Sequence, residues 1–133
     1  MINKNQPLRI AIAGLGFGEN VHIPASLSNK NIELLGLWHP RPERLKEACN
    51  KHNLCAYETW KDLVNDSEVE GIILATPPAP RYELALEAIK AGKHLLLEKP
   101  TCLNSEEVME LQRNSLKRNL KIAVDYEYRA VPL

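Results

Sequence analysis

Glu98, Lys99 and Pro100 form the segment of this chain with the clearest capacity for chemistry. They follow a short apolar run at residues 95–97 that has the composition of a buried strand. In an open parallel sheet, ligands bind beyond the carboxyl ends of the strands. A lysine that a buried strand delivers to this edge is therefore well placed to act on a bound molecule.

A glycine-rich turn near the amino terminus is the second candidate site, formed by Gly14, Leu15, Gly16, Phe17 and Gly18. Gly14 would permit a tight turn, and Gly16 would let a pyrophosphate approach the backbone without meeting a Cβ. The free N–H groups and partial positive charge of a following helix would favour the anion by about 0.3–1 kcal/mol. Because Glu19 stands where the dinucleotide fingerprint has a third small residue, an ordinary glycine-rich turn is the alternative interpretation. With Lys99, this turn indicates cofactor-dependent redox chemistry.

The end of the second expected strand carries the information on cofactor choice. An NAD site typically has Asp or Glu about 20 residues after the glycines, whereas the nearest acid here is Glu43, inside a helix start. His39, Arg41 and Arg44 form a cationic group instead, and arginine suits a 2′-phosphate because it offers paired N–H donors. We therefore predict NADP or NAD as the cofactor, with NADP favoured. A solvated, charged helix start is the alternative interpretation.

A glycine-rich turn after a first strand also occurs in methyltransferases that bind S-adenosylmethionine. Those enzymes usually carry an acid two residues before the turn, where this chain has Ile12, and another at the end of the second strand. Neither acid is present, so an S-adenosylmethionine-dependent transferase ranks below a dinucleotide-binding protein.

Alternation of strands and helices predicts the elements that position these residues. The strands are apolar on both faces, which is typical of a parallel sheet covered on both sides. We expect a doubly wound, Rossmann-type α/β sheet of about six strands with helices on both faces. The expected strands span residues 8–13, 32–38, 54–57, 71–75, 94–97 and 121–124, and the expected helices span 19–28, 42–52, 59–64, 80–91 and 104–119.

Composition excludes several classes of protein. The chain has 133 residues, enough for one domain, and its 17 basic residues balance its 17 acidic ones, which argues against a nucleic-acid partner. No segment has the length and apolarity of a membrane span, and residues 1–7 lack the apolar core of a signal peptide. The three cysteines form no CxxC pair and the four histidines show no metal spacing, so we expect a cytoplasmic protein with reduced thiols and no metal site.

Five blocks of residues then resemble a known family. They are Gly14 to Gly18 followed by Val21-His22-Ile23-Pro24-Ala25, Ala75-Thr76-Pro77-Pro78, Ala91-Gly92-Lys93-His94, Glu98-Lys99-Pro100, and Tyr128-Arg129 with Pro132. The chain is similar to the amino-terminal domain of the glucose-fructose oxidoreductase, inositol 2-dehydrogenase and rhizopine-catabolism (Gfo/Idh/MocA) oxidoreductases. The resemblance covers about residues 8–132, and its specific part runs from Ala91 to Pro100.

The resemblance implies roles for individual residues. Gly14, Gly16, Phe17 and Gly18 would line the pyrophosphate, and Thr76, Pro77 and Pro78 would line the cofactor cleft. Glu98 and Lys99 would lie beside the nicotinamide, with Lys99 as the catalytic cation that contacts the small-molecule substrate, a sugar-like or polyol CH–OH compound. An ammonium at that point would stabilise developing alkoxide charge. Two departures are Glu19, in place of a small residue, and Arg81, where many members carry histidine.

The resemblance also implies a second domain that supplies the substrate pocket and much of a dimer interface. We therefore expect residues 1–133 to form one dinucleotide-binding domain that binds cofactor weakly and turns over nothing alone. Apolar surface that such a domain would cover is expected to promote self-association. A non-catalytic NAD(P)-binding regulatory or partner module is the alternative function. Two points stay open. His22 lies near the cofactor or is simply packed in its helix. Residues 125–128 could reach the cleft in a full-length protein, but in this chain we expect them to form a frayed tail.

Overall fold

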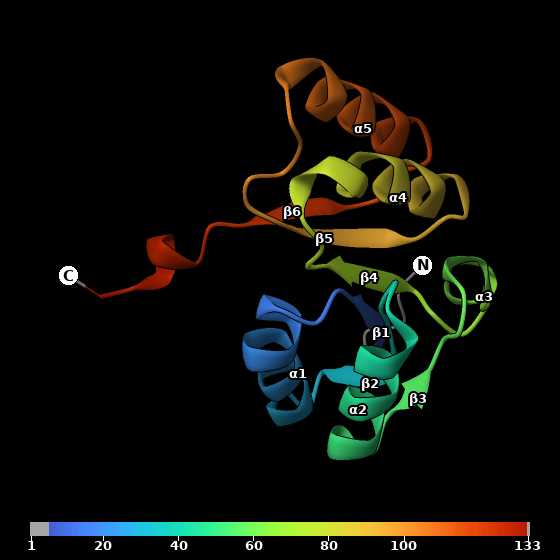
Figure 1. Cartoon of the computed structure of the whole chain (residues 1–133). Coiled ribbons are helices and arrows are strands. Elements are labelled where there is room, and N and C mark those ends of the chain that lie inside the picture. Colours follow the sequence, from blue (N-terminus) through green and yellow to red (C-terminus); the bar gives the residue numbers. More distant parts are fainter. Residues whose placement is uncertain (1–5, 133) are drawn as a thin grey trace.

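Six strands form one sheet in the order β3-β2-β1-β4-β5-β6 in the computed structural model, which describes residues 6–132 (Figure 1). Every neighbouring pair is parallel. This is the strand order of the doubly wound dinucleotide-binding fold, so the predicted fold class is confirmed. The strands are β1 (Leu8–Ala13), β2 (Ile32–Trp38), β3 (Cys55–Ala56), β4 (Gly71–Leu74), β5 (His94–Glu98) and β6 (Ile122–Asp125).

Helices cover both faces of this sheet. Their bounds are η1 (Gly18–His22), α1 (Ile23–Ser28), α2 (Pro42–His52), α3 (Trp60–Asn65), α4 (Pro78–Lys90), α5 (Ser105–Lys117) and the 3-10 helix η2 (Glu127–Ala130). The prediction that residues 1–7 form no signal peptide concerns mainly residues 1–5, which lie outside the described part of the chain. Within residues 6–132, none of the helices has the length and apolar character needed to cross a membrane.

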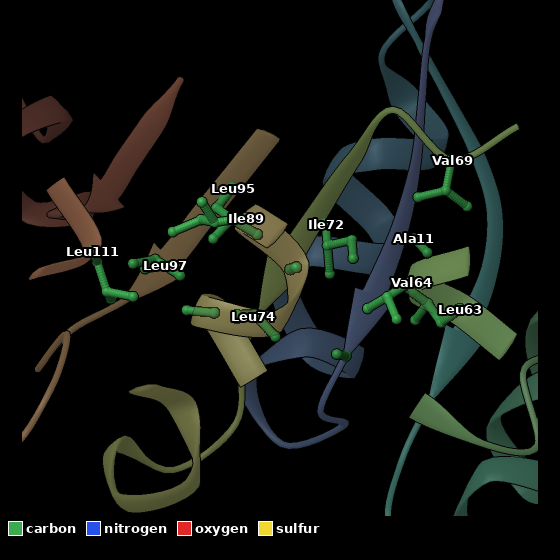
Figure 2. Packing of buried hydrophobic residues seen from close by; sticks show 13 residues of the cluster. Ala11, Leu63, Val64, Val69, Ile72, Leu74, Ile89, Leu95, Leu97 and Leu111 are labelled. Carbon is green, nitrogen blue, oxygen red and sulfur yellow. The ribbon is translucent and has the colours of Figure 1, made fainter. Parts of the chain in front are cut away.

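The alternation of side chains along β1 divides the core into two layers. Ile10 and Ile12 face one side with residues of α1 and α2, whereas Ala11 and Ala13 face the other side with residues of α3, α4 and α5. Figure 2 shows the second layer, in which Leu74 of β4 and Leu97 of β5 belong to the same apolar cluster as Ile89 of α4. Burying one such side chain contributes roughly 1.5–3 kcal/mol. This apolar sandwich holds the strand ends in fixed positions.

Element boundaries differ from the predictions by one or two residues at most positions. Strand β3 pairs only through two residues instead of the expected four, and α5 ends at Lys117 instead of near residue 119. Helix α4 begins at Pro78, earlier than predicted, because proline is well tolerated at the first helical position. The expected N-caps are confirmed, since Thr59 and Asn104 accept from the main-chain N–H of Asp62 and Glu107.

The helix predicted at residues 19–28 is built differently from expectation. Its first turn is a π-helix, Gly18–His22, in which the N–H of Ile23 donates to the carbonyl of Gly18, five residues back. The α-helical part follows, with Pro24 in its first turn. Since Pro24 has no N–H, the usual bond to residue 20 cannot form there, and the wider turn accommodates this gap.

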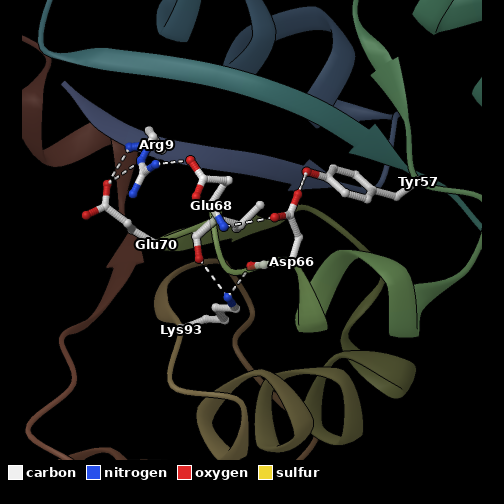
Figure 3. Close-up of polar contacts among 7 residues, drawn as sticks. Arg9, Tyr57, Asp66, Glu68, Glu70 and Lys93 are labelled. Carbon is white, nitrogen blue, oxygen red and sulfur yellow. Dashed lines mark hydrogen bonds and ion pairs between the residues drawn. The ribbon is translucent and has the colours of Figure 1, made fainter.

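A polar network closes the amino edge of the sheet (Figure 3). The buried Lys93 donates to the carbonyls of Asp66 and Val69 at 2.6 and 2.7 Å. Tyr57 donates its hydroxyl to the Asp66 carboxylate at 2.7 Å, which lowers the pKa of that carboxyl group. Arg9 donates through its main-chain N–H and its guanidinium to Glu70. This network fixes the turn between α3 and β4.

Candidate functional site

The carboxyl ends of β1, β2, β4 and β5 border one groove of about 590 Å³. That volume lies within the range of small-molecule sites. Its lining includes the following predicted site residues: Gly14, Gly16, Phe17, His39, Arg41, Thr76, Pro77, Pro78, Glu98 and Lys99. The structure therefore brings together all of the predicted site residues except Gly18 and Arg44.

Gly14 and Gly16 differ sharply in what surrounds them. Gly14 has φ +97°, and a Cβ there would lie 2.6 Å from the carbonyl carbon of Ala75. Only glycine fits this conformation and this approach between β1 and β4. At Gly16, by contrast, a Cβ would meet no described atom within 4 Å, because the position opens onto the groove. An anion can therefore approach the backbone at Gly16.

Gly18 lies beneath the turn instead of along the groove. A Cβ at this position would come within 3.2 Å of Ala75 Cβ and Ile12 Cγ2. Gly18 thus allows the start of η1 to pack closely on the sheet, which is the task of the third glycine in dinucleotide-binding turns. Its predicted contact with the cofactor stays a prediction.

Glu19 explains why Arg44 is not in the groove. The Glu19 carboxylate is buried and accepts from Arg44 at 3.0 Å, Lys51 at 2.9 Å and His52 at 3.4 Å. The hydrogen bond from Lys51, with His52 and the nearby charges of Lys51 and Arg44, holds the pKa of Glu19 below its ordinary value of 4.5. Arg44 and Lys51 of α2 also offset a negative charge that would otherwise oppose an anion at the helix start.

The end of β2 is less cationic than the sequence predicted. Burial lowers the pKa of His39, whose Nδ1 accepts from the main-chain N–H of Arg41 at 3.1 Å. His39 is therefore neutral at neutral pH, and Arg44 is held by Glu19 and by Glu47. Arg41 is exposed and carries the charge at this end of the groove.

The loop after β4 supplies an unused polar group. Thr76 is 5% exposed, and its Oγ1 is buried with no hydrogen-bond partner among the described residues. A buried hydroxyl without a partner is costly unless something binds it. Since Thr76 also lines the groove, this hydroxyl fits a ligand that carries hydrogen-bonding groups.

Arg81, on the first turn of α4, was not among the predicted site residues. Its guanidinium is buried and donates to the main-chain carbonyls of Thr76, Glu98 and Pro100. The sequence showed only that an arginine replaces a common histidine. Carbonyl groups from two separate segments meet at this side chain because α4 directly follows the loop after β4 and packs against β5.

Glu98 is held at its carboxylate as well as at its carbonyl. His22 Nε2 lies 2.7 Å from Glu98 Oε1 and 3.7 Å from Asp125 Oδ2. Burial, followed by the nearby Glu98, raises the pKa of Asp125. His22 is therefore bonded to a residue that lines the groove, although it is not itself among the lining residues. Its nearness to the cofactor stays a prediction. The three side chains have ligand atoms within 4.8 Å of one another, a cluster that histidine spacing could not predict.

Lys99 reaches the groove from the end of β5, and the Lys99–Pro100 peptide bond is cis. Its Nζ lies 3.1 Å from Glu127 Oε1 and 5.9 Å from the centre of the Tyr128 ring. The hydrogen bond to Glu127 raises the pKa of Lys99, so the side chain is an ammonium at neutral pH. In the segment expected as a frayed tail, Asp125 ends β6 and residues 127–130 form η2, which has no buried residue and projects from the body (Figure 1).

Comparison with known proteins agrees with this geometry. Residues 8–126 match the oxidoreductase family with an NAD-binding Rossmann fold, Gfo/Idh/MocA. The chain belongs to this family. The resemblance read from the sequence is thereby confirmed, as is the prediction of an oxidoreductase-family protein with a dinucleotide-binding domain.

Three relatives illustrate the similarity. An uncharacterized oxidoreductase of Synechocystis sp. is 36% identical over 98% of this chain and 36% of its own length. The inositol 2-dehydrogenase/D-chiro-inositol 3-dehydrogenase of Lactiplantibacillus plantarum is 29% identical over 77% of this chain and 30% of its own. The crystal structure of an NAD-binding protein from Listeria innocua superposes with a TM-score of 0.88 at 27% identity, covering 94% of this chain and 37% of that one. The chain spans about a third of the length of these relatives.

Proposed function

We propose that the groove binds a nicotinamide dinucleotide and that the chain is the cofactor domain of a dehydrogenase acting on CH–OH groups. The observation that carries this proposal is the shared groove, which joins the open backbone at Gly16 to the ammonium of Lys99. Gly14 and Gly16 would hold the pyrophosphate, and the unpartnered Thr76 hydroxyl would bind the nicotinamide half. When bound, the nicotinamide ring supplies or accepts the hydride.

Lys99 has the catalytic role in this proposal. Its ammonium has three N–H donors, so it can keep its bond to Glu127 and also donate to the oxygen of a substrate alcohol. That donation stabilises negative charge as it develops on the oxygen, an effect worth roughly 100-fold to 1,000-fold in rate for one well-placed donor. The raised pKa of Lys99 keeps Nζ protonated, so the ammonium acts as a hydrogen-bond donor to this oxygen. In the reverse direction, the reduction of a carbonyl, it can supply the proton that the new hydroxyl group requires.

We favour NADP over NAD because Arg41 lines the end of the groove next to β2. A guanidinium can donate two N–H groups to a 2′-phosphate, and no carboxylate is among the lining residues at that end. Arg44 would join it only by leaving Glu19, and His39 would contribute as a neutral donor or acceptor. The preference is therefore expected to be several-fold, not absolute.

The substrate class follows from the relatives. One of them is named an inositol dehydrogenase. We therefore propose a sugar-like or polyol substrate for the protein to which this domain belongs. Because the chain spans about a third of its relatives, we also propose that residues outside the matched region supply most of the substrate pocket. Residues 1–133 alone are then expected to bind cofactor without turnover.

Two minor proposals concern the environment of the chain. Cys49, Cys55 and Cys102 are all free, which suits the reducing cytoplasm.

An apolar hollow of about 290 Å³ on the sheet, lined by Ile73, Leu96 and Ile122 among others, supports weak self-association of two copies. Sedimentation over a concentration series tests this, and a chain that stays monomeric throughout would contradict it.

Calorimetric titration of the purified chain with NADPH, NADH and S-adenosylmethionine tests the main proposal. We expect binding of both dinucleotides, tighter for NADPH, and no binding of S-adenosylmethionine. Binding of S-adenosylmethionine alone would support the transferase alternative and overturn the proposal. Absence of binding by all three ligands would also overturn it.

A further inference from the structure

Arg81 joins two loops that are separate in sequence but adjacent along the groove. One donor group, Nη2, bonds to the carbonyl of Thr76 in the loop after β4. The other, Nη1, bonds to the carbonyl of Glu98, the last residue of β5, and to that of Pro100 in the loop that follows, and it lies 3.5 Å from the carbonyl of Thr101. A single side chain thus fixes the spacing between two walls of the groove.

Joining two loops through a buried cation has a cost in free energy, because the cation loses its contact with water. Arg81 is 2% exposed, and within residues 6–132 no carboxylate oxygen lies within ion-pair distance of it. It also stands on the first turn of α4, where the helix dipole opposes a cation. Burial lowers its pKa, and its Nε has no partner among the described residues. Desolvation of this cation costs free energy, as it does for the buried Lys93. The bonds of Arg81 differ because they join two segments that line the groove, so a role in the shape of the groove is expected.

The gain that the geometry offers is a fixed position for Glu98 and hence for Lys99. Arg81 holds Glu98 at its carbonyl from α4, while His22 holds it at its carboxylate from η1, on the other face of the sheet. The main-chain N–H of Lys99 also donates to Glu98 Oε2 at 3.3 Å. With Glu98 held on both sides, the Lys99 backbone cannot shift without breaking these bonds.

We propose that Arg81 is a positioning residue that ties the Thr76 loop to the Glu98–Pro100 loop and so shapes the nicotinamide end of the groove. The proposal rests on the proposed function, because it assigns that end to the nicotinamide. The ribose next to the adenine lies at the end of β2 in this fold, so the nicotinamide half must extend towards β4 and β5. Arg81 therefore acts on one half of the ligand and not on the other.

Comparing a whole dinucleotide with its adenosine half separates these effects. Calorimetry would measure the dissociation constants of NADPH and of adenosine 2′,5′-bisphosphate for the wild-type chain, Arg81→Met and Arg81→Lys. We expect Arg81→Met to weaken NADPH by about tenfold or more while the fragment changes less than about twofold. Arg81→Lys, which keeps the charge but lacks the forked geometry, should fall between.

Arg113→Met is the matched control, because it removes the same charge from an exposed position on α5. It should leave both constants unchanged. Each variant is first checked for folding by circular dichroism, and if Arg81→Met does not fold, Arg81→Lys decides the outcome. The fluorescence of bound NADPH is a second readout, since a displaced wall changes the surroundings of the reduced ring.

The two proposals fail in different ways. Equal loss of NADPH and of the fragment in the Arg81 variants, or no loss of either, would show a merely structural role and overturn this inference while the proposed function stands. A wild-type chain that binds neither ligand would overturn the proposed function, and this inference with it.

Discussion

Lys93 at the amino edge of the sheet and Arg81 at its carboxyl edge are both buried cations that donate to main-chain carbonyls. Burial lowers the pKa of each. Lys93, however, holds the carbonyls of Asp66 and Val69 within one short turn between α3 and β4 (Figure 3). Arg81 joins two loops, and both of them line the groove.

The two edges also differ in how completely their polar groups are used. Among the described residues, the buried side-chain atoms without a partner are Trp60 Nε1, Thr76 Oγ1, Arg81 Nε and Glu127 Oε2. Thr76 and Arg81 line the groove, Glu127 bonds to Lys99 of its lining, and the Trp60 ring packs on Trp38 of its lining. The groups at Lys93 and Asp66 are all bonded. A satisfied network contributes stability, whereas partners left open beside a groove are those expected of a binding site. The same fold therefore places its stability at one edge and its chemistry at the other.

The sharpest test of this contrast is Lys93→Met. Removing the ammonium leaves the buried Val69 carbonyl without a partner, while the Asp66 carbonyl keeps its bond from the Val69 N–H. We therefore expect the free energy of unfolding to fall by about 2 kcal/mol. Affinity for NADPH should not change at a temperature where the variant is folded. Denaturant melts and calorimetry measure the two quantities. Lys90→Met, at an exposed position near the end of α4, should alter neither, and a loss of affinity in Lys93→Met would break the contrast.

Gly16→Ala tests the opposite edge. No described atom lies within 4 Å of the added Cβ, so stability should be unchanged, but the methyl group occupies the approach of the pyrophosphate. We expect NADPH affinity to fall about tenfold, or about 1.4 kcal/mol. Unchanged affinity, measured by the same titration, would show that the ligand does not approach this backbone.

Arg41→Gln sharpens the account of cofactor choice. Losing an exposed charge-assisted contact should weaken NADPH about fivefold, or about 1 kcal/mol, and leave NADH unchanged. Arg44→Gln is the matched control, because its guanidinium already bonds to Glu19 and Glu47. If Arg44→Gln has the larger effect on the ratio of the two affinities, Arg44 reads the 2′-phosphate.

The smallest expected effect concerns acid stability. The pKa of Glu19 is lower in the folded chain than its ordinary 4.5, so its stabilising contribution is present above about pH 4.5 and is lost as the pH falls through the folded value. Glu19→Gln should therefore lower stability by about 1 kcal/mol at pH 7 and by less near pH 3. Urea melts at both pH values measure this, and a loss that does not shrink in acid would contradict it.

The fold was predictable because the strands are apolar on both faces and turn residues mark their ends. The meeting of Gly16 and Lys99 followed from the same argument, since the carboxyl ends of parallel strands share an edge. The contacts of Arg81 and His22 were not predictable, because His22 and Glu98 are 76 residues apart and meet only after helices on opposite faces have packed. The neutral state of His39 depends on burial, which spacing does not reveal.

The central claim is that a nicotinamide dinucleotide binds at the carboxyl edge and not at the amino edge. The most direct test is an NMR titration of the isotopically labelled chain with NADPH, following the main-chain amide signals. The account predicts progressive shifts at Gly14, Gly16, Thr76 and Lys99, with Glu70 and Lys93 unmoved. Shifts confined to the amino edge, or none at Gly16 and Lys99 at saturating NADPH, would contradict it.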